Sequence, residues 1–321
     1  MAKHITKVVL TGGPAAGKTT LVSRVLKEFK QEDGWRVITI PETATELISG
    51  FGIKPFGGCM SMLAFQDFVV ADQIHKEKLA LDAAQLVPEE NILILYDRAL
   101  MDDKAYVTDE EFAQVIARFD GRTEERVLAN YDLVLHLITC AKGAEFAYDL
   151  ANNARTESIE YAREMDDRTL RAWSAHPNLR IIDNDANFNR KIERALREIY
   201  LKGFEIAIKE SQPKAIMTSY NKVNGVHTAN SYDLCTTAAR KEWGFAGIIM
   251  TDWTTTNADG GSSAAKCIAA GNDLVMPGTD TDRREILDAL SAENDQYLEE
   301  KDLTACAQRI LEMIFTSNSY E

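Results

Sequence analysis

The chain has 321 residues and 45% of them are hydrophobic, so it exceeds one typical domain and has ample apolar surface for a folded core. Its formal net charge of -14 opposes non-specific binding to nucleic acid or to anionic membranes, because like charges repel. Composition and charge therefore exclude a largely disordered chain, speak against nucleic-acid and membrane partners, and favour a small-molecule substrate.

The cysteines and the start of the chain indicate a compartment. Five cysteines are scattered without CxxC pairs or zinc-like spacing: Cys59, Cys140, Cys235, Cys267 and Cys306. Such thiols are typical of a reducing environment. The first residues run straight into a short apolar strand without the pattern of a signal peptide, and no apolar run is long enough to cross a bilayer. We expect a soluble cytoplasmic protein.

Residues 1–200 alternate short apolar runs with amphipathic stretches, which is typical of a mostly parallel sheet covered by helices. The predicted strands are residues 7–10, 37–40, 92–96, 133–137 and 180–182. The predicted helices include residues 21–29, 64–84, 110–119 and 158–174. We predict a doubly wound α/β domain over residues 1–200.

The first predicted strand leads directly into a phosphate-binding loop. It comprises Gly12, Gly13, Pro14, Ala15, Ala16, Gly17, Lys18 and Thr19, which fit GxxxxGK[ST], and it continues into Thr20 and a predicted helix. Glycines allow backbone amides to surround phosphate oxygens, and the helix adds its positive end. Lys18 is expected to reach the β- and γ-phosphates and the Thr19 hydroxyl to bind Mg²⁺.

Two acidic residues follow predicted strands near this loop. Glu42 follows residues 37–40, where it either activates a substrate hydroxyl or holds a magnesium-bound water. The alternative is ordinary helix initiation, with Pro41 at the first helical position and Glu42 in the first turn. Asp97 ends the next strand and is expected to hold Mg²⁺ at the carboxyl edge of the sheet. The alternative for Asp97 is a cap for a helix that begins near Leu100.

Arginines further along the chain are candidates for neutralising the transferred phosphoryl group. They are Arg122, Arg155, Arg163, Arg168 and Arg171. Most arginines at helical spacing are solvated, and Arg163 with Asp167 fits an i,i+4 pair. Arg155 is favoured, because it stands in a predicted loop ahead of a helix that can fold over phosphates.

With these residues named, the first 200 residues resemble the AAA-type P-loop ATPases related to nicotinamide riboside kinase and thymidylate kinase. The matching segments are residues 8–20, 40–46, 95–106 and 154–184. The resemblance implies binding of ATP or GTP with Mg²⁺ and phosphoryl transfer to a small acceptor.

From residue 200 the alternation of predicted helices and strands continues into a second segment. Helices are predicted over residues 203–210, 233–242 and 262–270, strands over 215–220, 247–251 and 273–276, and two helices at the end. No flexible linker marks the transition, because residues 191–210 form one nearly unbroken helical pattern. We predict a second unit over residues 201–321.

Residues 193–321 resemble a fragment of the catalytic barrel of family 3 glycoside hydrolases, the β-glucosidase type. The resemblance rests on residues 197–205, 217–225, 241–253 and 270–278. It implies that Asp252 matches the nucleophile of that family. The family's acid/base carboxylate, its Lys-His pair and its sugar-binding aspartate have no matching positions in this chain.

A complete barrel of this kind needs about eight strands, whereas this segment supplies about three βα units. Retaining hydrolysis also needs two carboxyl groups about 5 Å apart. We therefore expect little glycosidase activity, and we expect open strand edges that favour self-association.

Three functions are compatible with the sequence. The leading one is a magnesium-dependent NTPase or small-molecule kinase that carries an incomplete glycosidase segment. The second is a β-glucosidase-like hydrolase that uses Asp252. The third is a non-catalytic or artefactual fusion.

Overall fold

The computed structural model describes residues 3–29, 34–55, 57, 59–150, 158–185, 187–223, 225–257, 260–291 and 297–317. The chain divides into two compact units, Met1–Lys202 and Gly203–Glu321. Among the described residues, no helix combines the length and apolar character needed to cross a membrane.

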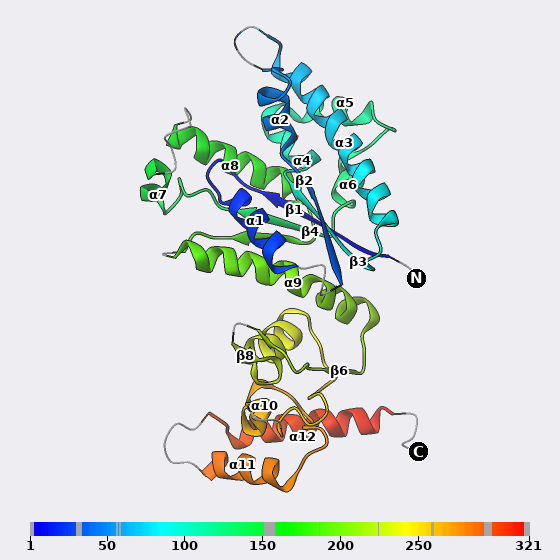
Figure 1. Ribbon diagram of the computed structural model, residues 1–321, viewed down its shortest axis with the longest axis vertical. Coiled ribbons are helices and arrows are strands. Elements are labelled where there is room, and N and C mark those ends of the chain that lie inside the picture. The colour runs from blue at the N-terminus through cyan, green and yellow to red at the C-terminus, as the bar shows by residue number, and fades with distance from the viewer. Residues whose placement is uncertain are drawn as a thin grey trace. The chain divides into compact units, whose positions relative to one another are not determined.

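A five-stranded parallel sheet forms the centre of the first unit, with strand order β2-β3-β1-β4-β5 (Figure 1). Its strands are β1 (His4–Thr11), β2 (Trp35–Ile40), β3 (Asn91–Asp97), β4 (Leu133–Leu137) and β5 (Leu179–Ile182). The central strands are almost continuously apolar and buried, as expected when both faces of a parallel sheet are covered. All five predicted strands are present.

Helices pack on both faces of this sheet, which confirms the predicted doubly wound α/β fold (Figure 1). They are α1 (Lys18–Glu28), α2 (Thr43–Ser49), α3 (Met62–Leu86), α4 (Leu100–Asp103), η2 (Lys104–Tyr106), α5 (Asp109–Ala117), α6 (Glu124–Leu128), α7 (Glu145–Leu150), α8 (Ile159–Trp173) and α9 (Phe188–Ser211). Leu21 and Ile192 pack against one face from α1 and α9. Val70, Phe112 and Trp173 pack against the other from α3, α5 and α8.

The strand order brings the predicted site residues to one edge of the sheet. β1 lies between β3 and β4, and Leu10 in β1 is in register with Asp97 in β3. The loop that follows β1 and the carboxylate that ends β3 therefore meet at the carboxyl edge, where ligands bind in open α/β sheets.

The second unit is built around a much smaller sheet. Its elements are the end of α9, then β6 (Ala215–Met217), β7 (Lys222–Val223), β8 (Val226–His227), η3 (Thr228–Asn230), the π-helix η4 (Asp233–Glu242), β9 (Ile248–Met250), α10 (Ala264–Ala270), α11 (Asp280–Ser291) and α12 (Glu300–Phe315). Strands β6 and β9 pair in parallel, and a single bridge joins Met250 to Leu274. Three short parallel segments thus represent the predicted barrel fragment.

Two predicted strands of this unit are shorter than expected. The strand predicted over residues 215–220 ends at Met217, because the Thr228 hydroxyl donates to the Ser219 carbonyl at 2.5 Å and bends the chain toward the β7–β8 hairpin. The strand predicted over 273–276 is reduced to the bridge at Leu274. Within the described residues neither segment has a second neighbouring strand, so nothing extends the ladder. The unbroken pattern predicted over 191–210 is confirmed by α9.

Candidate functional site

The turn between β1 and α1 has a backbone shape that requires glycine. Gly12 and Gly17 have φ angles of 130° and 98°, a region that other residues rarely adopt. A Cβ atom at Gly12 would lie 2.1 Å from the carbonyl oxygen of Leu137. The two glycines therefore allow a tight turn that lies against the end of β4.

The carbonyl groups of this turn are all hydrogen-bonded. Lys18 Nζ donates to the carbonyl oxygens of Gly12 and Gly13, both at 3.1 Å. The next four carbonyls accept as follows: Pro14 from Thr139 Oγ1, Ala15 from the Cys140 amide, Ala16 from Lys191 Nζ, and Gly17 from the Leu21 amide. The loop's own acceptors are thus occupied by protein donors.

Several amides of the same turn, by contrast, have no such partner. No described residue accepts a hydrogen bond from the amides of Ala15, Ala16 or Gly17. The first amides of α1 also lack partners within their helix, as at any helix start. Helix α1 has no acidic residue in its first turn and no side chain that caps it. Free amides and an uncompensated positive helix end are the features that suit a backbone turn to an anion.

Lys18 is a buried cation of the site. Its side chain is 9% exposed, and burial, aided by the charge of Arg98, lowers its pKa to about 8. Glu42, Asp97 and Asp102 offset part of this effect. The ammonium group therefore has two neutral carbonyl acceptors in the loop and three carboxylates close enough to favour its charged form.

Asp97 has an unsatisfied oxygen beside this cation. Its Oδ1 is buried and has no hydrogen-bond partner among the described residues, and burial raises the pKa of its carboxyl group. The residue that begins α4 is Ala99, whose amide donates to Asp102 at 3.0 Å. The cap alternative for Asp97 is therefore wrong, and its free oxygen suits a metal ion or a metal-bound water.

Glu42 forms part of a charged network with Arg98. Arg98 Nε donates to Glu42 at 2.6 Å, and its Nη1 donates to Asp102 at 3.1 Å. Burial opposes ionisation of Glu42, but the charges of Arg98 and Lys18 and a hydrogen bond from Thr45 outweigh it and lower its pKa to about 2. The helix-start alternative placed Pro41 at the first helical position and Glu42 in the first turn, whereas α2 begins at Thr43 and Glu42 is the extended residue directly before it.

The other predicted site residues of the first unit are the two threonines of the loop and the arginines. Thr19 and Thr20 are exposed in the first turn of α1. Arg155 lies outside the described residues. The predicted pair between Arg163 and Asp167 is wrong: Arg163 donates instead to the Ala141 carbonyl at 2.6 Å and to Glu145 at 2.8 Å.

Sequence reasoning missed three charged residues that contact the site: Arg98, Asp166 and Lys191. Asp166 accepts a hydrogen bond from the Gly13 amide at 2.8 Å, and Lys191 donates to the Ala16 carbonyl at 2.8 Å. A charged residue among apolar neighbours on the buried face of α8 or α9 was the available signal, because unpaired charges are rarely buried.

Asp252 of the second unit follows β9 at the carboxyl edge of the small sheet. Its Oδ1 accepts from the Trp253 amide at 2.6 Å, and Tyr220 lies nearby. Asp273, a neighbour in sequence, is fully buried and bound by Arg240 and Arg309, both at 2.6 Å. In the part of the chain that the structure describes, no contact brings a second carboxylate to Asp252.

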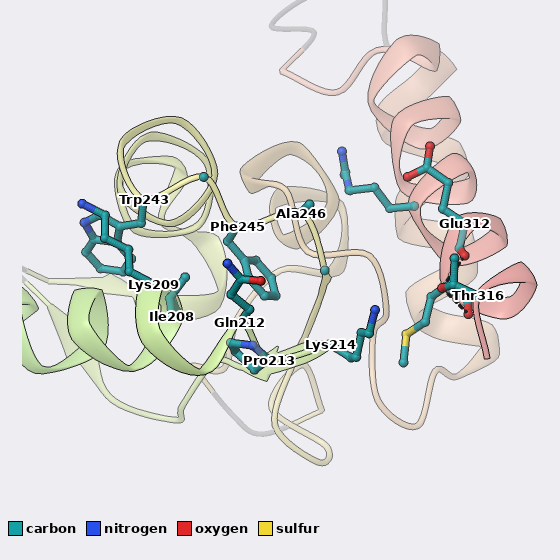
Figure 2. Close-up of a pocket in the computed structure, with 14 residues that line it drawn as sticks. Ile208, Lys209, Gln212, Pro213, Lys214, Trp243, Phe245, Ala246, Glu312 and Thr316 are labelled. Carbon is teal, nitrogen blue, oxygen red and sulfur yellow. Dashed lines mark hydrogen bonds between the residues drawn. The ribbon is translucent and has the colours of Figure 1, made fainter. Parts of the chain in front are cut away.

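A pocket of about 450 Å³ in the second unit lies at the other edge of this sheet. Its lining includes Lys214 just ahead of β6 and Gly247 just ahead of β9. Figure 2 shows Trp243 and Phe245 on one side of the pocket and Glu312 from α12 on the other. The pocket is therefore separate from Asp252, which follows the carboxyl end of β9.

Two family models match this chain. Residues 7–191 match the AAA domain, and residues 183–313 match the N-terminal domain of glycosyl hydrolase family 3. The predicted two-part resemblance is thus confirmed, and the two matches overlap at the start of α9.

Individual relatives and solved structures match different shares of this chain. β-Glucosidase B of Emericella nidulans is 44% identical over 129 residues, which are 40% of this chain and 15% of that protein. The chain thus spans about 15% of the length of this relative. The structure of a family 3 β-glucosidase from Bifidobacterium adolescentis is 36% identical, with a TM-score of 0.33, over 40% of this chain and 19% of that chain. Thymidylate kinase from Ehrlichia chaffeensis has a TM-score of 0.41 at 13% identity, over 61% of this chain and 99% of that chain.

Proposed function

Because the chain belongs to the AAA domain family, whose model matches residues 7–191 and hence more than half of its length, we propose that its first unit binds a nucleoside triphosphate. The proposed ligand is ATP or GTP together with Mg²⁺. The proposed reaction is transfer of the terminal phosphoryl group to a small acceptor or to water.

One observation carries this proposal: the polarity of the loop between β1 and α1. Its carbonyls are occupied by protein donors, whereas the amides of Ala15, Ala16 and Gly17 have no acceptor among the described residues. An anion with several oxygens can use all of these amides at once, together with the start of α1.

Lys18 and Asp97 supply the groups that phosphoryl transfer requires. In the proposed complex the Lys18 ammonium leaves the carbonyls of Gly12 and Gly13 and binds the β- and γ-phosphates. The Thr19 hydroxyl and the free oxygen of Asp97 would hold Mg²⁺. When bound, the ion neutralises phosphate charge as it develops in the transition state.

Glu42 is proposed to orient groups at the site. A carboxylate with a pKa near 2 is a weak base, since a general base works best with a pKa near the operating pH. Its ion pair with Arg98 keeps the carboxylate charged, which supports the alternative in which Glu42 holds a magnesium-bound water. We propose that Arg155 contributes charge to the transferred group.

The acceptor is proposed to be a small molecule, because the net charge of -14 disfavours binding of nucleic acid.

The protein is proposed to work in a reducing compartment such as the cytoplasm, which the five free thiols of its cysteines support.

Thermal unfolding in the presence of Mg-ATP and of Mg-GTP tests the proposal. Ligand at about 100 times its dissociation constant should stabilise the first unit by about 2.7 kcal/mol. Lys18→Ala should abolish most of that gain. Lys78→Ala is the matched control, because Lys78 is exposed on α3 and pairs only with its neighbour Asp82 in the described contacts. If neither nucleotide stabilises the wild-type chain, the proposal is wrong.

A further inference from the structure

Two fully buried charges of opposite sign contact the phosphate loop from outside it. Asp166 belongs to α8 and its side chain is 0% exposed, and Lys191 belongs to α9 and is 1% exposed. Burial of a charge is costly unless hydrogen bonds compensate for it, so the partners of these side chains indicate what they do.

Asp166 holds the first peptide group of the loop. Its Oδ1 accepts from the Gly13 amide at 2.8 Å and from the Thr139 amide at 3.1 Å, and its Oδ2 lies 2.9 Å from Lys142 Nζ. A Cβ atom at Gly13 would lie 2.9 Å from the Asp166 Cβ, so α8 packs directly on the loop. Burial opposes ionisation of Asp166, but His136, the Gly13 amide and Lys142 hold its pKa well below the ordinary value.

Lys191 holds a later peptide group of the same loop. Its ammonium donates to the carbonyls of Ala16 at 2.8 Å and Ile138 at 2.5 Å, and to Asn184 Oδ1 at 2.9 Å. An ammonium group has three donors, so these three acceptors use all of them. Lys191 is therefore committed to protein contacts and has no donor left for a ligand.

These two contacts also determine where neighbouring peptide groups of the loop point. In a trans peptide the C=O of one residue and the N–H of the next point in opposite directions. When Lys191 binds the Ala16 carbonyl, the Gly17 amide must point to the other side of the loop. When Asp166 binds the Gly13 amide, the Gly12 carbonyl must point away from Asp166, and there it accepts from Lys18.

We propose that Asp166 and Lys191 are positioning residues that fix the direction of the loop's peptide groups. Lys191 aims the Gly17 amide at the phosphate position. Asp166 aims the Gly12 carbonyl at Lys18 and so keeps the catalytic ammonium group near that position. This inference rests on the proposed binding of a nucleoside triphosphate.

Affinity for Mg-ADP and stability toward urea, measured on the same full-length variants, test the inference. Lys191→Met removes the cation while keeping the aliphatic length, and Arg190→Met is its control because Arg190 is an exposed neighbour on α9. Asp166→Ala removes the acceptor, and Asp167→Ala is its control because Asp167 binds the same Lys142 from an exposed position. Asp166→Asn retains an oxygen that can accept from the Gly13 amide.

We expect Lys191→Met and Asp166→Ala to bind Mg-ADP about 10-fold to 100-fold more weakly, by analogy with the loss of residues that orient metal ligands, which has effects of that size. Both controls should bind within about twofold of wild type, and Asp166→Asn should recover part of the affinity. If the two residues had a solely structural role, the variants would be less stable toward urea, but the molecules that remain folded would bind Mg-ADP as tightly as wild type. Wild-type affinity in folded Lys191→Met and Asp166→Ala would overturn the inference.

The wild-type chain provides a second test that does not depend on the folding of variants. In ¹⁵N–¹H spectra, Mg-ADP should shift the amide signals of Ala16 and Gly17 much more than that of Gly13, which Asp166 holds. A shift at Gly13 as large as that at Gly17 contradicts the inference. If Mg-ADP and Mg-ATP bind nowhere on the wild-type chain, the proposed function itself has failed, which is a distinct result.

Discussion

Both candidate sites of this chain lie at the carboxyl edge of parallel strands, but their surroundings differ greatly. At the first site, the loop after β1 is bound by side chains or amides from β4's end, α8 and α9. At the second, Asp252 accepts a hydrogen bond from the amide of its neighbour Trp253 and lies near Tyr220, and among the described residues β9 has only β6 and one bridge beside it. A five-stranded sheet supports one site, and a two-stranded sheet supports the other.

This difference indicates what a functional site requires beyond its signature residue. Asp252 stands in a segment that is 44% identical to a β-glucosidase, yet that similarity covers 15% of the relative. The phosphate loop, by contrast, is held by residues distant in sequence that the packing of α8 and α9 brings to it. Supporting contacts therefore separate the two sites more clearly than sequence identity does.

The largest expected effect concerns the independence of the two units. Asp273 is buried between Arg240 and Arg309 and accepts from the Ile249 amide at 2.8 Å. Asp273→Ala leaves two partly buried cations without their partner and should destabilise the second unit by about 3–5 kcal/mol. Urea-dependent hydrogen exchange reads each unit separately, and Asp288→Ala on the exposed face of α11 is the control. Equal destabilisation of the first unit would show that the units do not unfold separately.

A smaller effect is expected from the tight approach of the loop to β4. Gly12→Ala places a methyl group 2.1 Å from the Leu137 carbonyl oxygen, so the loop must move. Gly143→Ala is a matched control, because Gly143 also has a positive φ, of 81°, but has open space around it. We expect Gly12→Ala to cost about 1–3 kcal/mol more than the control in chemical denaturation, since overpacking has that cost. Equal losses of stability in the two variants would show that the loop accommodates a methyl group at Gly12 without strain.

The strands and the phosphate loop of the first unit were easier to predict from the sequence than the side-chain contacts around that loop. Strands such as residues 92–96 and the loop at residues 12–19 are local patterns of hydrophobicity and glycine, so they were predictable. The pairing of Asp166 with Gly13 joins residues 153 positions apart, and no local pattern encodes it. In the second unit, the strand expected over 215–220 was overestimated, because the hydrogen bond from Thr228 to Ser219 decides where β6 ends.

The pH dependence of nucleotide affinity gives a more moderate effect. The Lys18 pKa of about 8 lies below its ordinary value of 10.5, and a bound polyphosphate favours the protonated form and raises it again. Affinity for Mg-ATP should therefore be constant below about pH 8 and fall at higher pH, by at most about tenfold per pH unit from this group. Lys191 also has a pKa near 8, so Lys191→Met is titrated in parallel to separate the two lysines. Affinity that rises between pH 8 and 9 would contradict this account of Lys18.

The smallest effect is expected at Asp252. Without a second carboxylate in contact, we expect no release of an aryl group from a β-glucoside by the wild-type chain or by Asp252→Asn. The substitution should change stability by no more than about 0.5 kcal/mol, because Asp252 is not fully buried and its contacts are with the amide of its neighbour Trp253 and with the exposed side chain of Tyr220. Glycosidase activity that Asp252→Asn abolishes would revive the second function and remove the contrast between the two sites.

Hydrogen exchange of the intact chain with and without Mg-ATP tests the contrast between the two units most directly. The account predicts slower exchange in residues 12–21, with no change in residues 203–317. Protection confined to the second unit, or no protection of the loop at saturating Mg-ATP and Mg-GTP, would contradict it.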